Sequence, residues 1–315
     1  MGRVGRIGGV VAALVALTAC ASSTRPAPSS APAGQDIARG FDVGGRQVYL
    51  ECHGSSPPGR PTVVLISGYH DAGDVWGISE LITPPAVGPT VPEALASGHR
   101  VCAYDRPGTI RYSGDTPVLT DRSTPVPQPR TAADVVAELH ALLAAAEVPG
   151  PYLLTAHSLG GLFAQLYART YPGDVRGIVF VDAFSATIPE VFGARWPLYR
   201  DILSAAPPGT PLDRPEAEKI DVDRSVAQVG AAGPMPAVPI VVLTKTEPFQ
   251  TALPPPPGLP WEDTNRLYEQ AETALVQLRP DTPQVFATGS DHYIQWHDPD
   301  LVVAATELVA HRAAE

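Results

Sequence analysis

A serine near the middle of the chain lies between a segment that should form a strand and one that should form a helix. The apolar run 152–155 precedes it, and the amphipathic run 162–171 follows it. A sharp strand-to-helix turn needs small residues two positions before and two after its apex, because a larger Cβ would collide with the facing backbone. Ala156 and Gly160 supply them, so the sequence predicts that Ser158 stands exposed at the tip of such a turn. The first N–H groups of the following helix would face the same place and favour an oxyanion there.

The rest of the chain alternates between short apolar runs and amphipathic runs. The segments expected to be strands are 43–50, 63–66, 101–104, 152–155, 177–181, 239–244 and 284–287. Most are continuous apolar runs, which is typical of a sheet covered by helices on both faces. Helices are expected after a cap at Thr131 and from Pro299 to His311. This alternation predicts an α/β fold with right-handed crossovers and a mostly parallel central sheet flanked by helices.

The chain resembles the serine-type α/β-hydrolase family in four segments, taken in chain order. They are Ser67-Gly68-Tyr69-His70, Asp105-Arg106-Pro107-Gly108, the Ser158 turn and Gly289-Ser290-Asp291-His292. They are similar to the family's oxyanion loop, its Asp-Arg-x-Gly turn, its nucleophile turn and its histidine loop. The resemblance runs from about Gly40 to the C-terminus and implies an α/β-hydrolase fold with a small lid insertion. One departure is Ile110-Arg111-Tyr112-Ser113, which stands where the family usually has Gly-x-Ser, so the shape of this loop is not predicted.

The resemblance implies a catalytic triad with Ser158 as the nucleophile and His292 as its base. A hydroxyl is a poor nucleophile until its proton is removed as it attacks. Two carboxylates are candidates for the acid that orients the imidazole. Asp182 follows the strand expected at 177–181 and is preferred. Glu247 follows the later strand, which is the more frequent acid position in the family, but a proline stiffens its loop.

The implied reaction is hydrolysis of a small-molecule carboxylic ester, or of an amide, through an acyl-enzyme intermediate. The backbone N–H groups of Tyr69 and Leu159 would form the oxyanion hole. No cofactor is implied, and the histidine and cysteine spacings do not indicate a metal site. The alternatives are perhydrolase or haloperoxidase-like chemistry on the same triad, or a surface binding lipoprotein that has lost its activity. The chain is expected to be a monomer.

The beginning of the chain resembles a bacterial lipoprotein signal. Arg3 and Arg6 precede an apolar run, 7–17, that is too short to span a bilayer comfortably. The next residues complete Leu17-Thr18-Ala19-Cys20, which is similar to a lipobox. Lipidation of Cys20 would anchor an exported protein to the extracytoplasmic face of the cell membrane. An ordinary secretory signal is the alternative.

These features divide the chain into three expected parts. Residues 1–19 would be the signal peptide, and 20–38, rich in Ser, Pro and Ala, would be the lipidated cysteine with a disordered tether. Residues 39–315 would form a single hydrolase domain. Within it, the Pro-rich segment at about 184–238 is expected to be a lid, with a disordered insertion as the alternative.

Charge and cysteine content bear on partners and compartment. The formal net charge of −11 at pH 7 argues against nucleic acid or an anionic membrane surface as a direct partner. Export would place Cys52 and Cys102 in an oxidising environment. In the resembled fold the second strand, 46–53, lies beside the fourth, 100–104, which implies that these cysteines are cross-strand neighbours able to form a disulfide. Two buried free thiols are the alternative.

Overall fold

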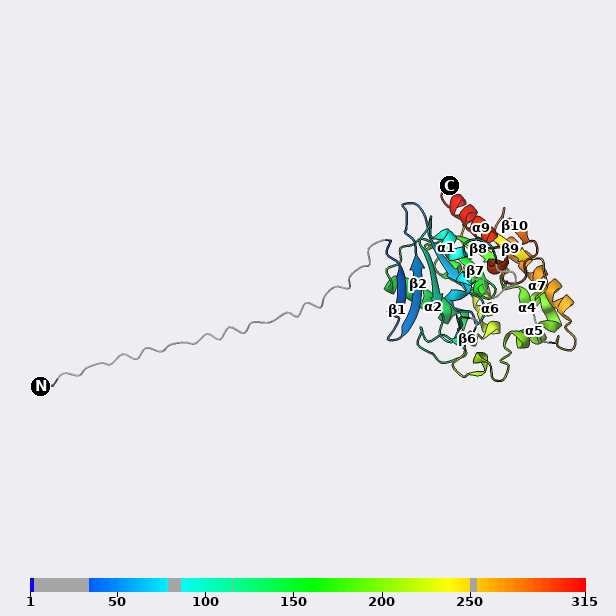
Figure 1. The fold of residues 1–315 in the computed structure, drawn as a ribbon. Helices are drawn as coiled ribbons and strands as arrows, with labels where there is room; N and C mark the ends of the chain where they lie inside the picture. The colour runs from blue at the N-terminus through cyan, green and yellow to red at the C-terminus, as the bar shows by residue number, and fades with distance from the viewer. Residues whose placement is uncertain (3–33, 79–85, 115, 250–253) are drawn as a thin grey trace. The chain divides into compact units, whose positions relative to one another are not determined.

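A twisted sheet forms the centre of the fold in the computed structural model, which describes residues 1–2, 34–78, 86–114, 116–249 and 254–315 (Figure 1). The sheet has eight strands in the order β1-β2-β4-β3-β7-β8-β9-β10. They are β1 (Ile37–Asp42), β2 (Gln47–His53), β3 (Thr62–Ile66), β4 (Val101–Asp105), β7 (Tyr152–His157), β8 (Val175–Val181), β9 (Ile240–Lys245) and β10 (Gln284–Ala287). Strands from β4 to β10 pair in parallel, whereas the β1–β2 and β2–β4 pairs are antiparallel. The expected mostly parallel sheet is confirmed.

Helices cover both faces of this sheet. The longest are α2 (Ala132–Ala145), α3 (Gly160–Thr170), α7 (Trp261–Val276) and α9 (Pro299–Arg312). Strand β3 shows how the two faces are filled: Val63 and Leu65 pack in the cluster that contains α9, whereas Val64 and Ile66 pack in the cluster that contains α2 and α3. Because alternate residues of a strand point to opposite faces, the whole of β3 is buried, which explains its unbroken apolar sequence.

The N-terminal part of the sheet corrects one expectation. Residues 43–50 do not form a single strand; they contain a tight turn followed by the first half of β2. Gly44 and Gly45 both have positive φ values, 65° and 86°, and the N–H of Val43 donates to the carbonyl of Arg46 at 2.8 Å. Two adjacent glycines allow this hairpin at low steric cost, and the residues before them therefore pair as β1.

The loop that departs from the family pattern forms a second, two-stranded sheet. Strand β5 (Ile110–Ser113) pairs antiparallel with β6 (Thr116–Leu119). The N–H of Ile110 donates to the carbonyl of His70, and the N–H of Ala72 donates to the carbonyl of Ile110. This hairpin therefore braces the loop that follows β3.

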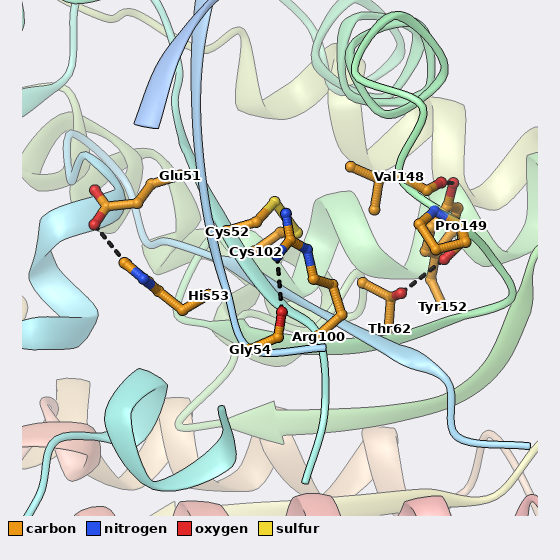
Figure 2. Close-up of a disulfide and its surroundings, with 10 residues drawn as sticks. All are labelled: Glu51, Cys52, His53, Gly54, Thr62, Arg100, Cys102, Val148, Pro149 and Tyr152. Atoms are coloured by element: carbon orange, nitrogen blue, oxygen red, sulfur yellow. Dashed lines mark hydrogen bonds and ion pairs between the residues drawn. A yellow bond between two sulfur atoms is a disulfide. The ribbon is translucent and has the colours of Figure 1, made fainter. Parts of the chain in front are cut away.

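Cys52 of β2 and Cys102 of β4 form a disulfide across an antiparallel strand pair (Figure 2). The two residues are direct partners in the ladder, with their Cα atoms 4.1 Å apart and both side chains buried. Nearby, Arg100 donates to the carbonyl of Gly54 at 2.8 Å. The bridge ties together strands that are 50 residues apart in the sequence.

Segment 184–238 contains ordered short helices rather than extended chain. They are α4 (Ile188–Phe192), α5 (Trp196–Leu203) and α6 (Val222–Ala231), with 3-10 turns at Gly193–Arg195 and Pro211–Asp213. Phe192, Trp196 and Tyr199 are buried, and the rings of Phe192 and Tyr199 stack with centroids 4.5 Å apart. The aromatic residues of this segment thus belong to the core that packs on α2 and α3.

The proposed leader and tether lie largely outside the described residues, since the placement of 3–33 is not described, and this covers Cys20. In the described part of the chain, no helix combines the length and the apolar character needed to cross a bilayer. The remaining short helices are η1 (Gly73–Gly77), α1 (Val91–Leu95) and α8 (Ile294–His297).

Candidate active site

The turn between β7 and α3 holds Ser158 at its apex. Ser158 has a φ of 50°, a left-handed conformation that a residue other than glycine rarely adopts, and its N–H donates to the carbonyl of Val181 at 3.2 Å. A Cβ on Gly160 would lie 2.4 Å from the carbonyl oxygen of Ile66. The small residue expected at position 160 is therefore required by the close approach of α3 to the end of β3.

The structure brings His292 to this serine from far along the chain. His292 lies in the loop between β10 and α8, and its Nε2 is 2.9 Å from Ser158 Oγ. Its Nδ1 is 2.5 Å from Asp182 Oδ2, at the end of β8. Because the carboxylate accepts from Nδ1–H, Nε2 is left free to accept the proton of the hydroxyl. This is the geometry that general-base activation of a serine needs.

Of the two candidate acids, Asp182 reaches His292 and Glu247 does not. Asp182 is completely buried, and it accepts the backbone N–H of Lys245 at its other oxygen, at 3.2 Å. Burial raises the pKa of Asp182, but the positive charge of Lys245 and the hydrogen bond from His292 outweigh burial and lower it to about 2. Glu247 is exposed, and its backbone N–H donates to the carbonyl of Ser290.

His157, next to the nucleophile, supports the loop that carries His292. Its ring is fully buried beneath the turn, and Nε2–H donates to the backbone carbonyl of His292 at 2.8 Å. Burial, with the nearby His292, lowers the pKa of His157 to about 3, so this ring is neutral. His157 is therefore a structural hydrogen-bond donor rather than a member of the triad.

Two backbone N–H groups belong to the loops that meet at the nucleophile. Neither the N–H of Tyr69 nor that of Leu159 has an acceptor among the residues that the structure describes. Gly68 allows the two loops to approach, since a Cβ there would lie 2.9 Å from the Cβ of Ser158. Unpaired N–H groups beside a nucleophile are what an oxyanion hole consists of.

A buried ion pair between Arg106 and Glu218 binds the backbone of the loop that contains Tyr69. Arg106 Nε donates to Glu218 Oε1 at 2.6 Å, and both side chains are completely buried. The same guanidinium donates to the carbonyls of Ser67 at 3.0 Å and Gly68 at 2.5 Å, while Glu218 accepts the N–H of His70 at 2.9 Å. The loop is therefore tied on both its carbonyl and its N–H side.

Sequence reasoning missed three buried polar residues near the triad: Glu218, Lys245 and Glu272. Glu218 lies in an irregular segment with no periodic pattern, and Glu272 lies on the amphipathic helix α7, where a charged residue is expected to face water. Lys245 follows the apolar run of an expected strand, and this position was the one indication in the sequence that its side chain is buried. In the described ranges, no group of three His, Cys, Asp or Glu side chains is placed to hold a metal ion.

Comparison with known proteins identifies the family. Residues 63–309 match the model of the alpha/beta hydrolase family, and the chain belongs to that family. The expected α/β-hydrolase fold is thereby confirmed, and the protein is an enzyme of that type.

Curated relatives match only part of their length. A putative carbamate hydrolase, RutD, of Cronobacter turicensis is 29% identical over 40% of this chain and 39% of its own. The monoacylglycerol lipase of Mycolicibacterium smegmatis is 26% identical over 61% of this chain and 62% of its own. An uncharacterized protein of Schizosaccharomyces pombe is 30% identical over 44% of this chain and 26% of its own. The chain thus spans between a quarter and three fifths of these relatives.

Solved structures share the fold at low identity. A putative lipase, lip1, of Acinetobacter baumannii superposes with a TM-score of 0.57 at 16% identity, covering 88% of this chain and 92% of that one. The esterase RhEst1 of a Rhodococcus species gives a TM-score of 0.51 at 19% identity, covering 88% of this chain and 98% of that one. At these identities the likeness concerns the fold alone.

Proposed function

We propose that this chain is a serine hydrolase that cleaves a carboxylic ester through an acyl-enzyme intermediate. The observation that carries the proposal is the continuous hydrogen-bond chain from Asp182 through His292 to Ser158. The unpaired N–H groups of Tyr69 and Leu159 beside the hydroxyl support it further. An amide is the alternative substrate, because the same groups act on both.

In the proposed mechanism His292 takes the proton of Ser158 as Oγ attacks the carbonyl carbon. The carbonyl π electrons move onto oxygen, and the N–H groups of Tyr69 and Leu159 stabilise the resulting oxyanion. When the tetrahedral intermediate collapses, His292 gives its proton to the leaving alcohol, and the acyl group stays on Ser158. Water, deprotonated by His292, then attacks the acyl-enzyme; as the bond between the acyl carbon and Ser158 Oγ breaks, His292 returns the proton to Oγ and the acid leaves. Asp182 fixes the imidazole tautomer and stabilises the imidazolium in both halves.

The surroundings of His292 favour a substrate with an apolar group. The rings of Phe249 and Tyr268 have centroids 5.0 Å and 6.0 Å from the imidazole, so apolar walls flank it. Two relatives, named a putative carbamate hydrolase and a monoacylglycerol lipase, bear the names of hydrolases, which supports the proposal. We therefore place this chain among hydrolases of small carbonyl substrates.

The test is labelling with a fluorophosphonate, followed by turnover of p-nitrophenyl esters of graded acyl length. Wild-type protein should be labelled at Ser158, and Ser158→Ala should not. Graded esters then report the depth of the acyl site. Absence of labelling in folded wild-type protein would refute the hydrolase proposal and favour the inactive binding protein. Peroxide-dependent turnover that exceeds hydrolysis would instead favour perhydrolase chemistry on the same triad.

We propose, from the sequence of the leader, that the enzyme is exported and anchored by lipid on Cys20. Cys20→Ser should then leave the leader uncut, and the mature form should be absent from immunoblots of the producing bacterium. Normal processing of that variant would leave an ordinary secretory signal as the explanation.

A further inference from the structure

A lysine stands beside the triad acid, at the position where the chain leaves β9. Lys245 is the last residue of β9, and its side chain is only 5% exposed. Its Nζ lies 3.4 Å from Asp182 Oδ2, the same oxygen that accepts from His292 Nδ1–H. The carboxylate is thus held on one side by the imidazole and on the other by the ammonium group.

Aromatic rings replace the water that would otherwise surround this ammonium group. The Nζ atom of Lys245 lies 4.1 Å from the ring centroid of Phe249 and 4.6 Å from that of Tyr268. A cation over aromatic faces is attracted by their quadrupoles, and more strongly where water is excluded. Tyr268 also donates its O–H to the backbone carbonyl of Asp182 at 2.8 Å. Lys245 and Asp182 are therefore fixed to each other through a shared neighbour.

A second carboxyl group is buried in the same place. Glu272 lies one helical turn after Tyr268 on α7, and its side chain has no exposed surface. Burial, with the adjacent charge of Asp182, outweighs the positive charge of Lys245 and raises the pKa of Glu272 well above its ordinary value, which favours the neutral carboxyl. Two acids thus share one buried site that contains one lysine.

The other titratable groups around Asp182 do not carry charge near neutral pH. Burial lowers the pKa of His157 to about 3 and raises the pKa values of Tyr199 and Tyr268 far above their ordinary value. His292 is the remaining group, and it is the proposed base. Lys245 is consequently the cation that decides where the negative charge resides.

We propose, on the basis of the hydrolase function inferred above, that Lys245 is a positioning residue of the triad. Its ammonium group keeps the negative charge on Asp182 rather than on Glu272 and holds the carboxylate facing His292. Lys245 does not touch the reacting atoms; it acts through the acid. Without it, a buried carboxylate beside a second carboxyl group would take up a proton more readily, and a lone carboxylate would favour the charged form of the imidazole.

Removing Lys245 should make the Asp182 carboxylate easier to protonate and should favour the imidazolium form of His292. Both effects move the acid side of the pH profile to higher pH. In Lys245→Met the side chain keeps its length and its packing on the two rings but loses the charge. The acid side of the pH profile for fluorophosphonate labelling should move to higher pH by about one unit, since an opposite charge within about 4–6 Å shifts a carboxylate by that much or more. On the acid side, labelling should therefore be about tenfold slower than in the wild type. A purely structural role would lower the labelled fraction equally at every pH.

The chain's other lysine provides a matched control. Lys219 is exposed, so Lys219→Met makes the same change of net charge away from the site and should leave the profile unmoved. Lys245→Arg retains the charge and should keep the wild-type profile position. If Lys245→Met does not fold, the arginine variant carries the test, and a shifted profile in that variant would contradict the inference. Folded Lys245→Met with the wild-type profile would overturn it. Failure of the wild type itself to be labelled would instead overturn the proposed function.

Discussion

Replacing Arg106 with methionine should destabilise the whole protein through the charge that is left behind. Arg106 and Glu218 are both completely buried and lie 2.6 Å apart. Removing one partner of a buried pair typically costs about 3–5 kcal/mol, because the other charge remains without compensation. The carbonyls of Ser67 and Gly68 also lose donors, at about 1 kcal/mol or more each. Glu218 can reduce the cost of its uncompensated charge by taking up a proton. We therefore expect the free energy of unfolding to fall by about 5 kcal/mol at neutral pH.

The pH dependence of this loss has a definite sign. In the wild type, burial acts to raise the pKa of Glu218, but Arg106 outweighs it and lowers that pKa. The pair therefore stabilises the fold above the unfolded-state pKa of Glu218 and ceases to do so as the pH falls through the folded-state pKa. In Arg106→Met the N–H of His70 still acts to lower the pKa of Glu218, but burial is the larger effect and raises it, so the variant loses stability as the pH rises past the unfolded-state value. The difference in free energy of unfolding between wild type and Arg106→Met should therefore increase from acid to neutral pH.

Urea denaturation at a series of pH values measures this gap. The double variant Arg106→Met/Glu218→Gln is the control: it contains no unpaired charge and should be more stable at neutral pH than Arg106→Met alone. A loss of less than about 1 kcal/mol in Arg106→Met would show that Glu218 is not left as a costly buried charge. So would a difference in unfolding free energy that does not change with pH, or a double variant no more stable than the single one.

Three further results are expected. Asp182→Asn should lower kcat by about 10⁴-fold in an ester assay, because the imidazole loses its tautomer, while Glu247→Gln should change it little; the reverse outcome would transfer the acid role. Gly160→Ala should cost at least about 1–3 kcal/mol in thermal unfolding, because its Cβ would meet backbone at 2.4 Å, and an unchanged Tm would contradict the close approach of α3 to β3. Replacing Cys52 and Cys102 together by Ala should cost about 4 kcal/mol relative to the oxidised wild type on the chain-entropy model for a 50-residue loop, and reduced wild type, the control, should lose a similar amount.

Periodicity and local chemistry were enough to place most of the sheet and the nucleophile turn. The strands around Ser158 are buried on both faces, so their apolar runs are unbroken and stand out from the surrounding sequence. The strand expected at 43–50 was misplaced because Gly44 and Gly45 form the turn of a hairpin, so only residues 47–50 belong to a strand, the first half of β2. Its partner, β1, buries only Ile37 and Phe41 and therefore gives a weak apolar signal.

The choice between Asp182 and Glu247 depended on features that are not local. Both follow a strand of the parallel sheet, and both could be presented at its carboxyl edge. The structure favours Asp182 because its carboxylate lies under His292, whereas the backbone of Glu247 is held by Ser290 with its side chain in solvent. Such a distinction depends on how one loop packs on another, which sequence spacing does not encode.

The end of β9 shows why the acid of the triad is Asp182 and not a residue of the loop after β9. At the end of β9 a lysine, Lys245, occupies a position where a carboxylate could lie. The negative charge is supplied by Asp182, directly after the neighbouring strand β8, whose Oδ2 is 3.4 Å from Lys245 Nζ. Once that pair forms, a further buried carboxyl group at position 272 can be accommodated only in its neutral form. Lys245, Asp182 and Glu272 therefore constrain one another: a change at any of the three alters where the charge facing His292 resides. The acid of this site is accordingly a property of three side chains on three elements, and its assignment requires all of them to be placed in space.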